Sequence, residues 1–136
     1  MKRISLILIV CLLFSFVTGI TASAEEYSID PRYNNSSNIS CNFKIMDNTA
    51  IATVDVVGYN NITSRISVNV KLEKRALLGL IWNDVEEWNA TSAYYSDSFE
   101  FTKSVGSGTY RCSFEITVEG SNGSAYVITE QITVKN

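Results

Sequence analysis

One stretch of sequence decides the fold of this chain: Tyr110-Arg111-Cys112-Ser113-Phe114-Glu115-Ile116-Thr117-Val118. Apolar and polar side chains alternate along it without an exception. Because successive side chains of a β-strand point to opposite faces, this segment buries one face and exposes the other. The pattern is typical of an antiparallel sheet with one solvated face.

Six further segments extend this pattern on both sides of the stretch. They are residues 39–45, 50–56, 66–72, 81–88, 99–101 and 126–134. Turn residues separate them, and Asn122-Gly123 is the strongest hairpin signal. No segment has a helical period, and one sheet cannot bury its own apolar face. We therefore predict an all-β fold, a seven-stranded antiparallel β-sandwich.

Residues 50–56 alternate less cleanly because Ile51 falls on the other face, and two further segments deviate more strongly. Residues 81–88 show no regular order of apolar and polar side chains, and Glu130 falls on the apolar face of residues 126–134. A charged side chain on the buried face predicts either a β-bulge or a position near an exposed strand end.

The N-terminus has the three parts of a secretory signal peptide. Lys2 and Arg3 precede an apolar run over 4–17, and Ala22-Ser23-Ala24 forms a small-residue cleavage site. The apolar run is shorter than the roughly 20 residues that a transmembrane helix needs. We therefore predict secretion to the extracellular space, with a signal peptide over 1–24, an extended lead-in over 25–37 and a single sandwich domain over 38–136.

The composition excludes several classes of function. The 136 residues include no histidine, which is the commonest general base and a frequent metal ligand, so we expect no cofactor and no metal. Removal of Lys2 and Arg3 with the signal peptide leaves 9 of the 11 basic residues against 14 acidic ones, a net charge of −5. This sign argues against a nucleic-acid partner and against contact with an anionic membrane.

Catalytic chemistry has little support in the remaining residues. Nucleophilic catalysis needs a nucleophile with a positioned base, and paired carboxylates hydrolyse glycosides only where they converge. Asp84, Glu86 and Glu87 cluster in sequence, but adjacent residues of a strand point to opposite faces. A solvated charge run is therefore a better interpretation than a calcium site. We predict that the protein is not an enzyme.

Two cysteines, Cys41 and Cys112, remain after cleavage of the signal peptide. An oxidising compartment and an even number of cysteines predict one disulfide between them. Both lie on the apolar faces of their segments, so both are expected to point into the core. The alternative is a pair of buried free thiols.

The segment Gly108-Thr109-Tyr110-Arg111-Cys112 resembles the entry to strand F of immunoglobulin domains. The resemblance implies that Tyr110 is a tyrosine-corner residue, whose hydroxyl binds upstream backbone near Val105 or Gly106. Trp82 lies 41 residues beyond Cys41 with two strands between them, which departs from the immunoglobulin spacing. Strand counting then gives A, B, C, C′, E, F and G, which is closer to fibronectin type III domains.

Four segments carry a second resemblance: Pro31-Arg32-Tyr33, Val70-Lys71-Leu72-Glu73-Lys74-Arg75, Trp82…Val85…Trp88 and Val105-Gly106-Ser107-Gly108-Thr109-Tyr110-Arg111. Through these four segments, the chain after Tyr27 resembles a family of small secreted proteins from Gram-positive bacteria. The resemblance implies secretion and a β-sandwich. That family has no assigned activity and no catalytic residues, so the resemblance implies nothing about chemistry.

The segment Ala76-Leu77-Leu78-Gly79-Leu80-Ile81-Trp82 is apolar where a hairpin connection is expected. Connections between strands are normally polar and exposed. Three interpretations remain open: the segment plugs the open end of the sandwich, contacts a partner or ligand, or inserts into a membrane. The candidate contact residues, including aromatic residues that follow, are Leu77, Leu78, Leu80, Ile81, Trp82, Trp88, Tyr94 and Tyr95.

Two classes of function fit these observations. The first is a secreted, non-catalytic binding or adhesion module of unknown ligand, and carbohydrate binding would need the candidate aromatic side chains to be exposed and coplanar. The second is a structural or interaction protein, such as a cell-surface assembly subunit or a secreted protein inhibitor. Such a protein would engage a protein partner through the hairpin over 76–88, and its leucine and isoleucine side chains would form an exposed patch.

Overall fold

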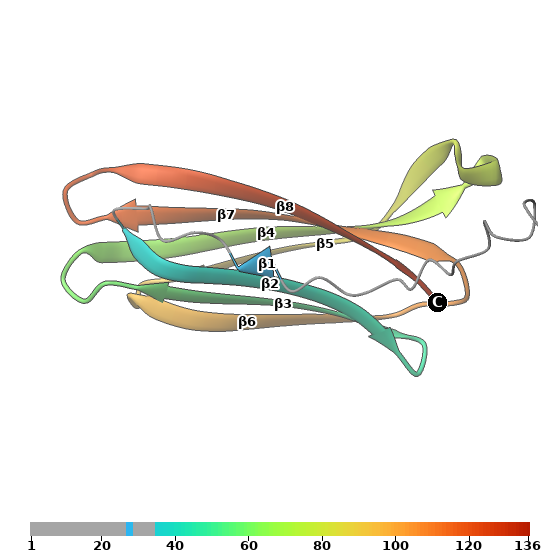
Figure 1. Ribbon diagram of the computed structural model, residues 1–136, viewed down its shortest axis with the longest axis horizontal. Coiled ribbons are helices and arrows are strands. Elements are labelled where there is room, and N and C mark those ends of the chain that lie inside the picture. Colours follow the sequence, from blue (N-terminus) through green and yellow to red (C-terminus); the bar gives the residue numbers. More distant parts are fainter. Residues whose placement is uncertain (1–26, 29–34) are drawn as a thin grey trace, which may run out of the picture.

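The computed structural model describes residues 27–28 and 35–136, which form two antiparallel sheets packed face to face (Figure 1). The predicted signal peptide over 1–24 and much of the predicted lead-in lie outside the described residues. The strands are β1 (Tyr27–Ser28), β2 (Ser36–Met46), β3 (Thr49–Gly58), β4 (Thr63–Ala76), β5 (Ile81–Ser92), β6 (Ser96–Ser104), β7 (Thr109–Gly120) and β8 (Ala125–Lys135).

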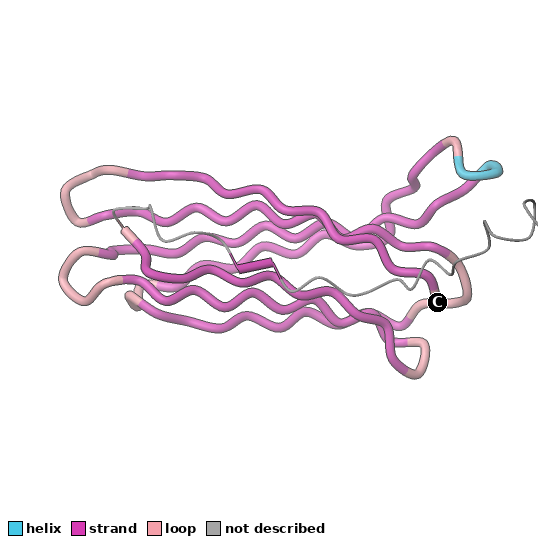
Figure 2. Tube along the Cα trace, in the orientation of Figure 1, coloured by secondary structure: helices cyan, strands magenta, loops and turns pink. Residues whose placement is uncertain are grey.

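The two sheets combine strands that are distant in sequence. One sheet has the order β1-β2-β3-β6 and the other the order β5-β4-β7-β8. With the two-residue β1 set aside, these are the sheets A-B-E and C′-C-F-G of the fibronectin-like strand count. The predicted seven-stranded antiparallel β-sandwich is therefore confirmed. Figure 2 shows the loops confined to the two ends of the sandwich.

The core lies between the sheets and follows the alternation of the sequence. Every apolar residue of the stretch over 110–118 is buried on the inner face of β7. β4 packs beside it, with Val70 opposite Phe114. The facing sheet contributes Phe43 and Val54, both at most 1% exposed. Burial of each such side chain is worth about 1.5 to 3 kcal/mol, and this holds the two sheets together.

The irregular segment over 81–88 contains a β-bulge. Val85 has no partner in the pairing of β4 with β5, because its two neighbours on the strand pair with consecutive residues of β4. An extra residue shifts the alternation by one position and sends the following side chains to the other face. Trp82 and Trp88 therefore lie on opposite faces of the sheet, although an even number of positions separates them.

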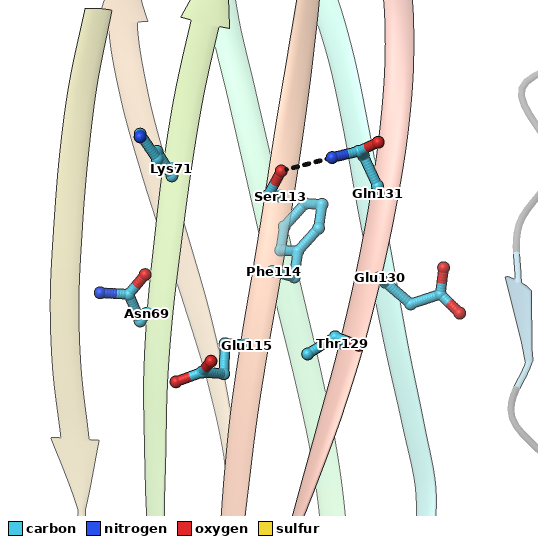
Figure 3. Close-up of a pocket in the computed structure, with 8 residues that line it drawn as sticks. All are labelled: Asn69, Lys71, Ser113, Phe114, Glu115, Thr129, Glu130 and Gln131. Atoms are coloured by element: carbon cyan, nitrogen blue, oxygen red, sulfur yellow. Dashed lines mark hydrogen bonds between the residues drawn. The ribbon is translucent and has the colours of Figure 1, made fainter. Parts of the chain in front are cut away.

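Glu130 lies in the middle of β8, and neither predicted explanation of its position is correct. The β7–β8 pairing runs without a register shift and places Glu130 opposite Phe114, so there is no bulge and no strand end. The side chain is half-buried on the inner face. Because β8 is an edge strand, the carboxylate reaches solvent past the side of the sheet, and Figure 3 shows it extending away from β7.

The sandwich begins earlier than predicted. Ser36 and Ser37, expected in the lead-in, belong to β2, and Asn35 before them is buried. The Asn35 amide donates hydrogen bonds to the carbonyls of Val118 and Ser124, at 3.3 and 3.2 Å. A buried amide needs such partners. Here they tie the start of one sheet to the β7–β8 hairpin of the other.

Cys41 and Cys112 are buried free thiols, so the predicted disulfide is wrong and the alternative interpretation holds. Both do point into the core, but Cys41 belongs to β2 and Cys112 to β7, in different sheets. Packed sheets lie about 10 Å apart, whereas a disulfide needs Cα atoms within about 7 Å. Facing the same core is therefore not sufficient to bring two sulfur atoms together.

Candidate functional site

The β4–β5 hairpin ends in an aliphatic tip, which consists of Leu77, Leu78, Leu80 and Ile81. The exposed fractions of these side chains are 68%, 103%, 83% and 41%. The ribbon continues to the pair Ala76 and Ile81, and a 3₁₀ turn over Leu77–Gly79 closes it. Figure 1 shows the hairpin projecting away from the body of the sandwich. The interpretation as a plug is wrong, because the two strands carry the tip outward into solvent.

The backbone of the tip is unfavourable for its side chains. Leu77 and Leu78 have φ values of 46° and 57°. The left-handed region costs a residue other than glycine about 1 to 2 kcal/mol. The β2–β3 turn has φ values of 49° and 57°, but there the residues are Asp47 and Asn48, which tolerate this conformation. The tip therefore keeps leucines where the backbone favours asparagine or glycine.

The aromatic residues of the predicted patch are spread over three places. Trp88 lies on the inner face and stacks on Phe101 of β6, with ring centres 5.6 Å apart. Tyr94 and Tyr95 are exposed, but they follow β5 at the end opposite to the aliphatic tip. Trp82 alone among these four lies beside the tip. The four rings therefore share no common plane for a sugar.

Two arginines hold Trp82 at the base of the tip. The Cζ atom of Arg111 lies 4.4 Å from the centre of the indole ring, and that of Arg75 lies 5.9 Å from it. Arg111 also pairs with the buried Glu73, whose Oε2 is 2.7 Å from Nη2. Glu73 and Arg111 are direct partners in the β4–β7 pairing. The sequence pattern did not predict this cluster, because the register of non-adjacent strands decides which outer-face residues meet.

Two cations without an acidic partner lie next to the tip. Among the ion pairs of the described residues, none involves Lys74 or Arg75. The hairpin carries no acidic residue between Lys74 and Asn83. The acids that flank this segment are Glu73 and Asp84, and each has a basic nitrogen within 2.8 Å. The local charge beside the tip is therefore positive, against the sign of the whole chain.

The acidic side chains of the run over 84–87 have different partners. Asp84 accepts a hydrogen bond from Lys71 at 2.8 Å, which raises the pKa of Lys71. The hydrogen bond from Lys103 of β6 lowers the pKa of Glu86. Within the described ranges, no group of three or more Cys, Asp or Glu side chains could hold a metal ion.

A shallow groove crosses the outer face of the sheet β5-β4-β7-β8 (Figure 3). The Gln131 amide donates to the Ser113 hydroxyl at 2.9 Å, and the Asn69 amide donates to Asn89 at 2.7 Å. These polar groups satisfy one another, and the lining offers no exposed aromatic ring. The residues that line the groove are Asn69, Lys71, Ser113, Phe114, Glu115, Thr129, Glu130 and Gln131.

The remaining candidate residues are structural. Tyr110 donates a hydrogen bond of 2.9 Å to the carbonyl of Gly106, the bond expected of a tyrosine corner. Burial raises the pKa of Cys41 and of Cys112 to about 12. Because the thiolate is the nucleophile, neither cysteine is reactive near neutral pH.

The comparisons with known proteins add no family to this description. No model of a protein family matches the chain, and no curated protein matches it significantly. The described part of the chain has no helix with the length and apolar character needed to cross a bilayer.

Proposed function

We propose that this protein is a secreted, non-catalytic attachment module that binds its partner through the aliphatic tip. The observation that carries the proposal is the exposure of Leu77, Leu78 and Leu80 on a backbone that favours other residues. Interfaces take most of their free energy from a few large anchors, and exposed apolar patches mark interaction sites. An assembly subunit and a secreted inhibitor are both forms of such a module.

The base of the hairpin supports this role. Arg111 of β7 lies over the Trp82 ring of β5 and pairs with the buried Glu73 of β4, so both strands are joined to β7 directly behind the tip. A preorganised anchor loses less conformational freedom on binding than a mobile loop. The tip is therefore presented in one orientation.

Adhesion to carbohydrate through an aromatic platform has less support. Trp88 is engaged in the core, and Tyr94 and Tyr95 lie at the far end of the molecule. The groove on the outer sheet face is lined by polar and charged side chains and has no exposed aromatic ring on which a sugar could stack. The exposed aliphatic side chains are thus the better candidates for contact with a partner.

Replacement of Leu77 and Leu78 by asparagine tests the proposal without disturbing the turn. Asparagine tolerates a positive φ, so the variant should fold and melt at the same or a higher temperature than the parent chain. Attachment of the labelled mature protein to cells of the producing organism should fall about tenfold or more, since two apolar anchors are lost.

The matched control is Val127→Asn, because Val127 is an exposed aliphatic side chain on β8, far from the tip. This variant should attach like the parent protein. Attachment that survives in the Leu77→Asn/Leu78→Asn variant, or that falls equally in Val127→Asn, would contradict the proposal.

A further inference from the structure

The aliphatic tip is a convex apex rather than a flat patch. Leu77, Leu78 and Leu80 follow one another around the turn, and each exposes two thirds or more of its surface. A protein partner would need a deep pocket to bury all three. The interfacial layer of a lipid bilayer closes around an inserted apolar object from every side. The shape of the tip therefore favours a bilayer.

Lys74 and Arg75 form a basic collar behind this apex. They precede Leu77 by three and two positions, and no acidic residue lies between them and the tip. At about 3.3 Å per strand residue, the collar lies roughly 7 to 10 Å behind the apex. Apolar segments of interfacial proteins bury to a depth of about 5 to 10 Å. Insertion of the leucines would thus bring the collar to the level of the lipid phosphates.

The two collar residues are held differently: Nζ of Lys74 lies 5.4 Å from the centre of the Tyr110 ring of β7, whereas Arg75 is held by the hairpin itself. Nε of Arg75 donates to the carbonyl of Gly79 at 3.3 Å, and its guanidinium lies over the Trp82 ring. Trp82 is opposite Arg75 in the β4–β5 pairing. Indole rings favour the membrane–water interface because one part is apolar and the other polar. Trp82 therefore occupies the level at which an inserted hairpin would meet the headgroups.

We infer that the partner of the aliphatic tip is an anionic lipid bilayer, an inference that rests on the proposed function. The leucines enter the boundary between headgroups and acyl chains, and Lys74 and Arg75 contact the phosphates. The net negative charge of the chain would oppose membrane contact only if every charged side chain interacted with the membrane surface. Electrostatic interactions are screened beyond about 8 Å at physiological ionic strength. The membrane surface would meet the collar, while the nearest acids, Glu73 and Asp84, are each paired with a basic side chain.

Vesicles of defined composition test this inference on the mature chain. The sequence contains two tryptophans, so a Trp88→Phe background leaves Trp82 as the only indole reporter. With vesicles of phosphatidylcholine and phosphatidylglycerol, the protein should co-sediment and the Trp82 emission should shift to shorter wavelength. Phosphatidylcholine alone should bind the protein more weakly, because it lacks the negative surface charge.

Three variants separate the contributions to vesicle binding. Leu77→Asn with Leu78→Asn should lower partitioning by about tenfold or more, because the apolar anchors are lost. Lys74→Gln with Arg75→Gln should remove the preference for phosphatidylglycerol and the dependence on salt. Val127→Asn should change neither quantity.

Failure to bind either type of vesicle, or binding that the leucine variant retains, overturns the membrane inference. If cells still capture the parent protein and not the leucine variant, the proposed function stands and the partner is a protein. A concentration-dependent dimer that the leucine variant abolishes would assign the tip to a second copy of the chain, and would also overturn the inference. If cells capture both proteins equally, the proposed function itself fails.

Discussion

Trp88 of β5 stacks on Phe101 of β6, with ring centres 5.6 Å apart and ring planes at 17°. These strands are the edges of different sheets, so the stacked pair closes one side of the sandwich. Glu86 and Lys103, which form an ion pair, join the same two strands. Trp88 is therefore part of the structural core rather than of a binding patch.

Trp88→Ala should lower the free energy of unfolding by about 2 to 4 kcal/mol, because a large ring and its stacking partner lose contact. Urea unfolding measures the change. Trp82→Ala is the matched control on the outer face of the same strand and should cost less than half as much. Equal costs would show that the bulge at Val85 does not separate the two rings.

Tyr110→Phe should lower the free energy of unfolding by about 1 kcal/mol, because it removes the hydrogen bond to the Gly106 carbonyl while keeping the ring in the core. Tyr94→Phe changes an exposed hydroxyl and should have no measurable effect. If the two variants are equally stable, the Tyr110 hydroxyl contributes nothing to the fold.

Cys41 and Cys112 should both be alkylated after unfolding without reductant, and neither should react in the native protein at neutral pH. We expect this result because both thiols are free, buried and protonated in the folded protein. Intact mass spectrometry of the purified protein measures it. A mass two hydrogens lower, with no alkylation after unfolding, would establish a disulfide instead.

The raised pKa values of Cys41 and Cys112 make the free energy of unfolding depend on pH. Their pKa is about 12 in the folded protein and near 9.0 when exposed, so the unfolded state loses these protons first. The contribution of the buried thiols to stability is therefore fully present below pH 9 and is lost between pH 9 and 12, by on the order of 1 kcal/mol per pH unit for each thiol. Cys41→Ala with Cys112→Ala should flatten this slope. An unchanged slope would assign the alkaline loss to other groups.

Gly58→Ala should cost about 1 to 3 kcal/mol through overpacking. An added Cβ would lie 2.3 Å from the carbonyl oxygen of Tyr95, which accepts a hydrogen bond from the Gly58 amide. Gly106→Ala is the control, because its Cβ would meet no atom within 4 Å. The control should stay within about 0.5 kcal/mol of the parent protein in thermal or urea unfolding.

The position of the aliphatic tip could be predicted from the sequence because it breaks a local rule. Leu77, Leu78 and Leu80 stand where a connection should be polar, and this conflict is visible without a structure. Whether the tip folds inward or projects could not be predicted, because that depends on how far the β4–β5 ribbon extends beyond the rest of its sheet. The prediction that Trp82 and Trp88 belong to one patch was wrong for a similar reason. The unpaired Val85 between them turns the side chains that follow it to the opposite face of the sheet.

The all-β class and the inward side chains of the regular strands could be predicted from spacing within single segments, and the tyrosine corner from the resemblance of one short segment to immunoglobulin domains. The alternation from Tyr110 to Val118 needs no partner to identify its buried face. The contact of Glu73 with Arg111, the separation of Cys41 from Cys112 and the exposure of the tip could not be predicted in this way. These features depend on register and on the distance between sheets, which arise from packing among residues far apart in the chain.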